Sequence, residues 1–328
     1  MKKKIGITLG DPAGIGPEIV LKAIIRHPDI YEKCFPVIYG DPYILNFYRE
    51  LLGLKTKILE IADLNQLSDT KSDVIYCLPV SRFRKKIIPG KVAGQSGLMA
   101  YNYIKKAVEH AIEGKLNAIV TAPINKEALK MGGVPYLDHT AILSEQTNSP
   151  NTMTLFVTGN LRIFFYSRHI AFREIADSLN KSDITESLRQ CHKYLEKIGI
   201  KDPEIAVAAL NPHSGENGMF GREEIEILFP AVKVLRKSGL KVDGPVSADS
   251  VFHQTAEGRY DAVLALYHDQ GHIAAKTYDF HRTVSITMGL PFLRSSVDHG
   301  TAMDIAGKNI ANETSMVEAI DAAIRYSW

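Results

Sequence analysis

Strand-like and helix-like segments alternate along almost all of the 328 residues. Short apolar runs typical of buried strands recur at residues 5–9, 35–39, 74–78, 118–121, 205–210, 262–267 and 283–288. Segments with helical character separate them, at residues 17–27, 42–52, 101–113, 184–198, 223–238 and 315–326. This alternation predicts a layered α/β fold with a largely parallel sheet, because a strand–helix–strand unit returns the chain to a neighbouring parallel strand. Gly159 and Asn160, between two further apolar runs, predict a hairpin.

The length and composition allow one large domain or two medium-sized ones with a substantial core. Hydrophobic residues make up 45% and charged residues 23% of the chain, as in ordinary globular proteins. The net charge of +2 gives no reason to expect a nucleic acid or an anionic membrane as a partner. Three widely separated cysteines favour a reducing compartment over a disulfide framework. Without a long apolar run or the features of a signal peptide, we expect a cytoplasmic protein.

Three histidines lie at or just after strand-like runs. His169, His213 and His268 each follow a different one of these runs. Because ligand sites of α/β sheets form at strand ends, three strands could each deliver one imidazole to a catalytic divalent metal with a position left open. The alternative is three unrelated polar residues in loops. The Gly, Asn and Asp residues beside the histidines favour the shared site.

A glycine-rich turn, Gly-Asp-Pro-Ala-Gly-Ile-Gly-Pro-Glu, follows the first strand-like run at residues 10–18. Such a turn before a helix can present backbone N–H groups to an anion. Its spacing matches neither the dinucleotide-binding nor the P-loop fingerprint, so a Rossmann domain is not expected. A purely structural turn and direct ligand contact both remain open.

Several charged side chains could belong to a site. His139, Lys276 and Arg294 could bind an anionic substrate, since an arginine can hold a carboxylate or phosphate with two parallel hydrogen bonds. Taken alone, His139 is equally explained as a surface residue, and Lys276 and Arg294 are better explained as surface charges. The basic stretch at residues 82–86 is interpreted as a solvated loop. Asp249 precedes a predicted helix, where it could be an N-cap or could support a metal ligand.

Five motifs occur in order over nearly the full length: GDPAGIGPE, TAPINKEAL, NPHSGENG, YHDQGH and LPFLRSSVDHGTAMDIAG. Together they resemble the 4-hydroxythreonine-4-phosphate dehydrogenase family of pyridoxal phosphate biosynthesis. The resemblance implies a two-lobed α/β/α fold like that of isocitrate and isopropylmalate dehydrogenases, with a central cleft. It also implies a homodimer whose site is shared across the interface. The lobes would comprise residues 1–130 with 285–328, on the cofactor side, and residues 131–284, on the metal and dimer side.

The same resemblance assigns roles to individual residues. A divalent metal, with Zn²⁺ expected first and Mg²⁺, Mn²⁺ or Co²⁺ as alternatives, would be bound by His169, His213 and His268, the last acting across the dimer. The substrate contacts would be His139, Thr140, Lys276, Arg294 and Ser285, which replaces an asparagine of the family. NAD or NADP would bind a loop like the nucleotide-binding loop of isopropylmalate dehydrogenases, at His299, Gly300, Thr301, Asp304 and Asn312. The hydroxyl proton would be relayed by Lys276 or Asp249.

The implied reaction is a metal-dependent, NAD(P)-linked oxidation and decarboxylation of a phosphorylated 3-hydroxy acid. The expected substrate is 4-phosphooxy-L-threonine, which would give 3-amino-2-oxopropyl phosphate. The alternative is D-threonate or D-erythronate 4-phosphate, since YHDQGH also resembles that branch. Asp138, Ala141 and Ser285 depart from the family's substrate pattern, so the chemistry is better supported than the substrate. A phosphate acyltransferase-like enzyme and a non-catalytic binding protein are more distant alternatives, and the three histidines argue against both.

Overall fold

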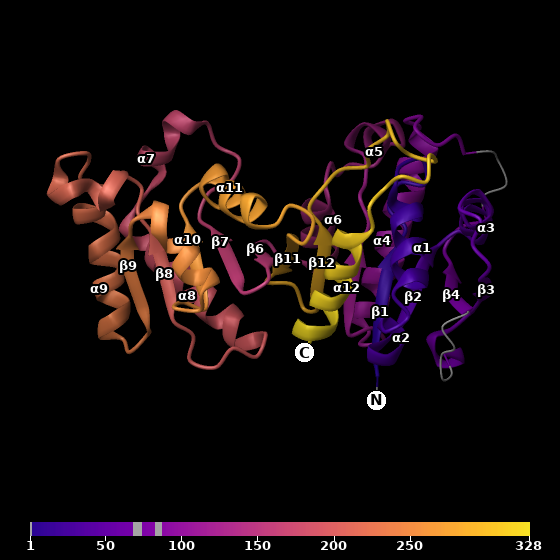
Figure 1. Ribbon diagram of the computed structural model, residues 1–328, viewed down its shortest axis with the longest axis horizontal. Coiled ribbons are helices and arrows are strands. Elements are labelled where there is room, and N and C mark those ends of the chain that lie inside the picture. Colours follow the sequence, from indigo (N-terminus) through magenta and orange to yellow (C-terminus); the bar gives the residue numbers. More distant parts are fainter. Residues whose placement is uncertain (1, 68–73, 83–86) are drawn as a thin grey trace. The chain divides into compact units, whose positions relative to one another are not determined.

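The computed structural model describes residues 2–67, 74–82 and 87–328. The chain divides into two compact units, the first comprising Met1–Thr152 and Val284–Trp328 and the second Met153–Thr283 (Figure 1). Residues 131–152, which the sequence analysis assigned to the second lobe, therefore belong to the first unit. The reason is that α6 (His139–Thr147) packs against α4 (Gly94–Ile112) of that unit.

The first unit is built on strands in the order β3-β4-β2-β1-β5-β12-β11. Their bounds are β1 (Lys3–Thr8), β2 (Cys34–Gly40), β3 (Lys57–Glu60), β4 (Val74–Pro79), β5 (Ala118–Thr121), β11 (Val284–Met288) and β12 (Leu293–Val297). Neighbouring strands are parallel except β11 and β12, which are antiparallel. Ile7 and Thr8 of β1, whose side chains point to opposite faces, are both fully buried, as expected for a parallel strand that is covered on both faces.

Helices cover the first unit's sheet. They are α1 (Gly16–Arg26), α2 (Ile30–Lys33), α3 (Pro42–Leu51), α4, α5 (Lys126–Met131), α6 and α12 (Thr314–Tyr326). α4 packs on β1, β2 and β5 and contacts α5 and α6, whereas α12 packs on β12, β5 and β1 and contacts α1 and α2 (Figure 1). A core cluster that includes Tyr39, Ile104 and Ile119 fills the space between α4 and the strands.

The second unit has strands in the order β6-β7-β10-β8-β9. Its strands are β6 (Met153–Thr158), β7 (Leu161–Phe165), β8 (Ile205–Ala208), β9 (Val242–Val246) and β10 (Ala262–Ala265). Its helices are α7 (Ile175–Ser178), α8 (Lys181–Lys197), α9 (Phe229–Lys237), α10 (Ala248–Ala256) and α11 (His268–Tyr278). β6 and β7 form the antiparallel hairpin predicted at Gly159 and Asn160, and the other neighbouring pairs are parallel. α10 and α11 pack on β7 and β10 over Phe165, Val251 and Val263.

α4 begins earlier than its apolar periodicity indicated. It starts at Gly94, not near residue 101, because two glycines let its first turns approach α5. A Cβ atom at Gly97 would lie 2.2 Å from backbone atoms of Ala128. Because glycine normally weakens a helix, the sequence pattern did not include the first turns of α4. Those turns form because they pack against α5.

The predicted helix at residues 223–238 begins as a π-helical turn, Glu224–Leu228, and continues as α9. Glu224 is buried, and its Oε1 accepts hydrogen bonds from the backbone N–H groups of Leu210 (2.9 Å) and Asn211 (2.8 Å). This carboxylate therefore fixes the end of β8, where the His213 segment begins.

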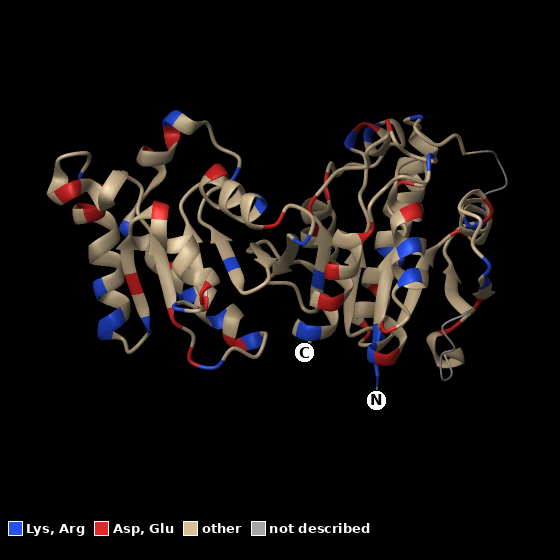
Figure 2. Cartoon of the chain, in the orientation of Figure 1, with Lys and Arg blue, Asp and Glu red and all other residues tan. Residues whose placement is uncertain are grey.

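Charged residues of both signs occur on the helices of both units (Figure 2). This mixture agrees with the small net charge. In the parts of the chain that the structure describes, no helix is long and apolar enough to cross a membrane. Arg82 forms an ion pair with Glu60 (2.7 Å), while the rest of the predicted basic loop, residues 83–86, lies outside the described residues.

Candidate functional site

The carboxyl ends of β7 and β10 bring two of the three predicted metal ligands together. The strands are parallel neighbours, with Phe165 opposite Ala265, so the segments that follow them emerge at the same edge. The ring centroids of His169 and His268 lie 6.3 Å apart. Both rings line a pocket of about 350 Å³, whose other walls are Ser167, Arg168, Ile170, Phe172, Ile175, Tyr267 and Asp269.

The ring of His268 is held from two sides. Its Nδ1 atom lies 2.6 Å from Oδ1 of Asp269, and its ring stacks on that of His272 at 3.6 Å between centroids. Because a carboxylate only accepts hydrogen bonds, Nδ1 is the ring nitrogen that donates to Asp269, and Nε2 is the nitrogen that this contact leaves unused. A carboxylate that fixes a histidine in this way is typical of metal sites.

The rings of His169 and His268 are further apart than those of two histidines on one metal ion. Two imidazoles on a tetrahedral zinc, with Zn–N bonds of about 2.1 Å, have ring centres roughly 5 Å apart. His213 is not brought to this pair as a third ligand: among the described residues, no group of three His, Cys, Asp or Glu side chains could hold a metal. The assignment of His268 to a site across the dimer stays a prediction. Within one chain, the ring centroid of His268 lies 6.3 Å from that of His169.

His213 lies on an exposed turn. The residues from His213 to Asn217 have positive φ, and the φ of His213 itself is 50°. Its side chain is 69% exposed, with Nδ1 3.5 Å from Oε2 of Glu216. The described residues therefore do not group His213 with the other two histidines, and strand periodicity could not predict the conformation of this turn.

The two predicted proton carriers lie on helices of the second unit and do not line the histidine pocket. Asp249 is exposed in the first turn of α10, whose N-cap is Ser247, so the interpretation of Asp249 as an N-cap is wrong. Lys276 lies in the last turn of α11, with Nζ 4.8 Å from the ring centroid of Phe280.

In the first unit, Arg294 is a buried cation whose hydrogen-bond partners among the described residues are hydroxyl groups. It lies on β12, is 5% exposed, and donates to Oγ1 of Thr121 through Nε (3.0 Å) and Nη2 (2.6 Å) and to Oγ1 of Thr287 (3.0 Å). Within the described residues no carboxylate forms an ion pair with it. Burial lowers the pKa of Arg294 to about 9, although Asp138 acts in the opposite direction. The guanidinium thus remains charged near neutral pH.

The charge of Arg294 acts on His139. This histidine is the first residue of α6, whose N-cap Asp138 accepts a hydrogen bond from the N–H of Ala141 (2.9 Å). Burial, and then the charge of Arg294, lower the pKa of His139 well below its usual value, so its ring is neutral near pH 7. Its Nε2 atom is buried without a hydrogen-bond partner among the described residues.

Two further predicted substrate residues lie on α6 and β11, the elements that carry His139 and Thr287. Thr140 follows His139 on α6. Ser285 lies on β11 two residues before Thr287, so its side chain leaves the same face of the strand as the threonine that binds Arg294.

The predicted nucleotide loop packs against the glycine-rich turn. Ile15 N–H donates to the carbonyl of Thr301 (3.0 Å), and a Cβ at Gly14 would lie 2.9 Å from Cβ of Thr301. Asn312 uses its Oδ1 to accept from the N–H of Thr314 (2.8 Å) at the start of α12. The turn thus has a structural role here, and the question of direct ligand contact stays open.

A sequence model described as "Pyridoxal phosphate biosynthetic protein PdxA" matches residues 32–323. The chain belongs to the PdxA family. A Clostridium botulinum protein provisionally named D-threonate 4-phosphate dehydrogenase is 47% identical over 331 residues, covering 99% of this chain and 97% of that protein. A Fusobacterium nucleatum protein with the same provisional name is 45% identical, with 100% and 98% covered. The solved 4-hydroxythreonine-4-phosphate dehydrogenase of Klebsiella pneumoniae matches with a TM-score of 0.91 and 39% identity, covering 100% of this chain and 99% of that one.

These comparisons confirm the predicted family, the α/β fold of the isocitrate dehydrogenase-like kind and the enzyme class. The protein is a PdxA-family dehydrogenase, and a dehydrogenase of this family points to a nicotinamide cofactor. The family resemblance therefore held over the whole chain.

Asp11, within the first family motif, is a buried acid to which the sequence analysis gave no role. Its Oδ1 accepts from the N–H of Ala13 (2.9 Å), while Oδ2 is buried without a partner among the described residues. Burial raises the pKa of Asp11 to about 6. An acid between a buried strand and a glycine-rich turn is the signal that could have drawn attention to it.

Replacing Asp11 with asparagine should change how stability depends on pH. The folded carboxyl has a pKa of about 6 against 3.8 in the unfolded chain, so the native protein loses stability as pH rises through this window. Asparagine does not titrate there. The free energy of unfolding of Asp11→Asn, relative to the native protein, should therefore rise by about 2–3 kcal/mol between about pH 4 and pH 7. Urea unfolding at a series of pH values measures this, and a difference independent of pH would contradict it.

Proposed function

We propose that this PdxA-family dehydrogenase oxidises and decarboxylates a phosphorylated 3-hydroxy acid with NAD or NADP. The two substrates in question are 4-phosphooxy-L-threonine and D-threonate 4-phosphate, with D-erythronate 4-phosphate as a close variant of the second. The names of the relatives at 47% and 45% identity favour the threonate compound, and the name of the structural neighbour at 39% favours the other. The sequence motifs alone had favoured 4-phosphooxy-L-threonine.

The observation that carries the proposal is the buried guanidinium of Arg294. A buried cation is costly unless an anion pairs with it, and the described residues provide only the hydroxyl groups of Thr121 and Thr287. A substrate carboxylate or phosphate would supply the missing charge. A planar guanidinium would also fix the orientation of that group, which sets the geometry for hydride transfer.

Neutral His139 would complete the anion site together with Thr140 and Ser285. Its buried Nε2 atom can hydrogen-bond a substrate oxygen without adding a second positive charge beside Arg294. A site that already has one cation and neutral hydrogen-bonding groups would select a substrate by shape and hydrogen bonding as well as by charge.

His169, His268 and His213 would hold one divalent cation, with Zn²⁺ the first candidate and one of the three ligands supplied across a homodimer. The paired geometry of His169 and His268 and the Asp269 contact support this assignment. A bound cation would supply Lewis acidity at the C3 hydroxyl. Lys276 or Asp249 would accept the hydroxyl proton, and the C3 hydride would pass to the nicotinamide, which the His299–Asn312 segment would bind. The resulting β-keto acid would then lose its carboxylate as CO₂.

The test is NAD(P)H formation by the purified, Zn²⁺-loaded protein. 4-Phosphooxy-L-threonine, D-threonate 4-phosphate and D-erythronate 4-phosphate would each be supplied with NAD⁺ and with NADP⁺, and a chelated sample would serve as control. Chelator-sensitive reduction with one of these acids, accompanied by CO₂ release, is the expected result. Binding of all three acids without any reduction would contradict the proposed reaction.

A further inference from the structure

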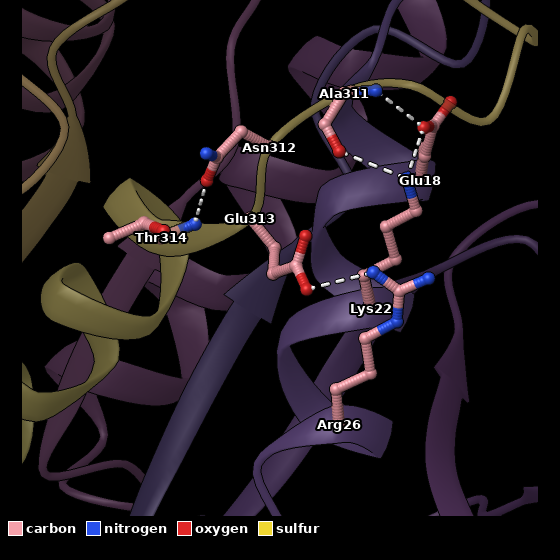
Figure 3. A network of polar contacts seen from close by, with 7 residues as sticks. All are labelled: Glu18, Lys22, Arg26, Ala311, Asn312, Glu313 and Thr314. Atoms are coloured by element: carbon pink, nitrogen blue, oxygen red, sulfur yellow. Dashed lines mark hydrogen bonds and ion pairs between the residues drawn. The ribbon is translucent and has the colours of Figure 1, made fainter.

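A buried ion pair on α1 holds the segment that follows β12. Oε1 of Glu18 lies 2.7 Å from Nζ of Lys22, one helical turn further on, and the two side chains are 0% and 3% exposed (Figure 3). Glu18 is the last residue of the glycine-rich motif, which the sequence analysis left without a settled role. We call residues 299–313, which lead from β12 to α12, the strap.

Both polar groups of one strap residue bind to this ion pair. The N–H of Ala311 donates to Oε1 of Glu18 (2.9 Å), and the carbonyl of Ala311 accepts from Nζ of Lys22 (2.9 Å). Figure 3 shows the carboxylate and the ammonium group facing this short stretch of backbone. Ala311 is 3% exposed, so neither backbone group can turn to water instead.

The same part of the chain holds the strap at its other end. The carbonyl of Thr301 accepts from the N–H of Ile15, immediately before α1. The glycine-rich turn and the first two turns of α1 therefore fix the strap at Thr301 and again at Ala311. Among the proposed nucleotide-binding residues, Thr301 is itself one of these two points and Asp304 lies between them. The others, His299, Gly300 and Asn312, lie within two residues of one of the points.

A buried ion pair is weak evidence for stability, because two apolar side chains of similar size are often as stable. Apolar side chains could not, however, satisfy the N–H and carbonyl groups of Ala311 at once. Glu18 and Lys22 therefore differ from an apolar pair because they fix the path of the strap. A segment that is already ordered loses less conformational freedom when a ligand binds to it.

We propose that Glu18 and Lys22 are positioning residues that preorganise the strap for the nicotinamide dinucleotide. The inference rests on the proposed function only in taking the strap as the dinucleotide site. Neither side chain touches the cofactor, and both act through the backbone of Ala311. The role explains why an acid and a base occur at buried positions of α1.

The test compares Lys22→Met with Arg26→Met. Arg26 lies one turn further along α1 and pairs with Glu313 of the strap (3.0 Å), but its side chain is 51% exposed. Dissociation constants for NAD⁺ and NADP⁺ would be measured by calorimetry on the full-length protein, together with hydrogen exchange of the strap amides and kcat at saturating dinucleotide. The neutral double variant Glu18→Gln/Lys22→Met, which leaves no unpaired buried charge, covers the case in which Lys22→Met does not fold.

We expect Lys22→Met and the double variant to speed exchange across the strap and to raise the dissociation constant of the preferred dinucleotide about tenfold, with kcat little changed. Arg26→Met should leave both quantities within about twofold. Faster exchange with unchanged dinucleotide affinity would overturn the positioning role, and so would unchanged exchange. If the unsubstituted protein bound neither dinucleotide, the proposed function itself would fail, which distinguishes the two cases.

Discussion

Arg294→Met should lower kcat/KM for the phosphorylated hydroxy acid by about a hundredfold or more, mainly through KM, because it removes charge-assisted hydrogen bonds to the anion. The ligand-free variant should nevertheless unfold at the same temperature as the native protein or a higher one. Because burial lowers the pKa of Arg294 to about 9, keeping the charge buried costs on the order of a few kcal/mol, which methionine removes. Steady-state kinetics and thermal unfolding measure the two effects.

Arg162→Met is the matched control. Arg162 is also a buried arginine on a strand, at 8% exposure, but its Nη1 donates to the backbone carbonyls of Asn160 (3.3 Å) and Asp261 (3.1 Å). This substitution should lower stability and leave KM for the acid unchanged. Unchanged kcat/KM in Arg294→Met would exclude Arg294 from the substrate site, whatever its effect on stability.

Mixing two inactive metal-ligand variants should restore activity if the site is shared across a dimer. His213→Ala and His268→Ala should each lower kcat by roughly a thousandfold, the loss expected when Lewis-acid stabilisation worth several kcal/mol is removed. After subunit exchange at equal amounts, half of the dimers are mixed and one of the two sites in each is intact. About a quarter of the native activity should therefore return.

The opposite outcome has a structural basis of its own. His169 and His268 of one chain already face the same pocket, 6.3 Å apart. If all three ligands came from a single chain, neither site of a mixed dimer would be complete, and no activity would return. Subunit exchange must be shown independently, for example by native mass spectrometry of differently tagged chains. Zinc content measured on each variant would separate loss of the metal from loss of the fold.

The alternation of short apolar runs and helical segments was sufficient to predict the α/β class, since strand and helix periods are local properties. The hairpin at Gly159 and Asn160 was readable for the same reason. The start of α4 was not, because glycines at Gly94 and Gly97 are favourable only once α5 lies against them. The strand order could not be predicted from local patterns either. β12 lies between β5 and β11, and β5 is far from β12 in the sequence.

Part of the candidate site could be predicted from the sequence. Histidines after β7 and β10 could be grouped because parallel neighbouring strands end at the same edge, and the structure does bring His169 and His268 together. The conformation of His213 depends on a run of positive φ angles that no spacing rule describes. Its position near a strand end made Arg294 a candidate anion ligand, and the family resemblance assigned it to the substrate, but the sequence did not show that it is buried. Its significance comes from burial beside Thr121 and Thr287, which only the assembled sheet creates.

If the proposed substrate anion binds at Arg294, the amount of folded protein should depend on the concentration of that anion. Without the anion, every folded molecule carries the cost of a buried guanidinium, and a ligand that binds only the folded state removes part of that cost by mass action. Proteases act on the small unfolded or partly opened fraction, which shrinks as the ligand concentration rises. If the proposed function holds, a cell rich in the phosphorylated acid would therefore contain more of this protein at the same rate of synthesis, and a cell that exhausts the acid would contain less.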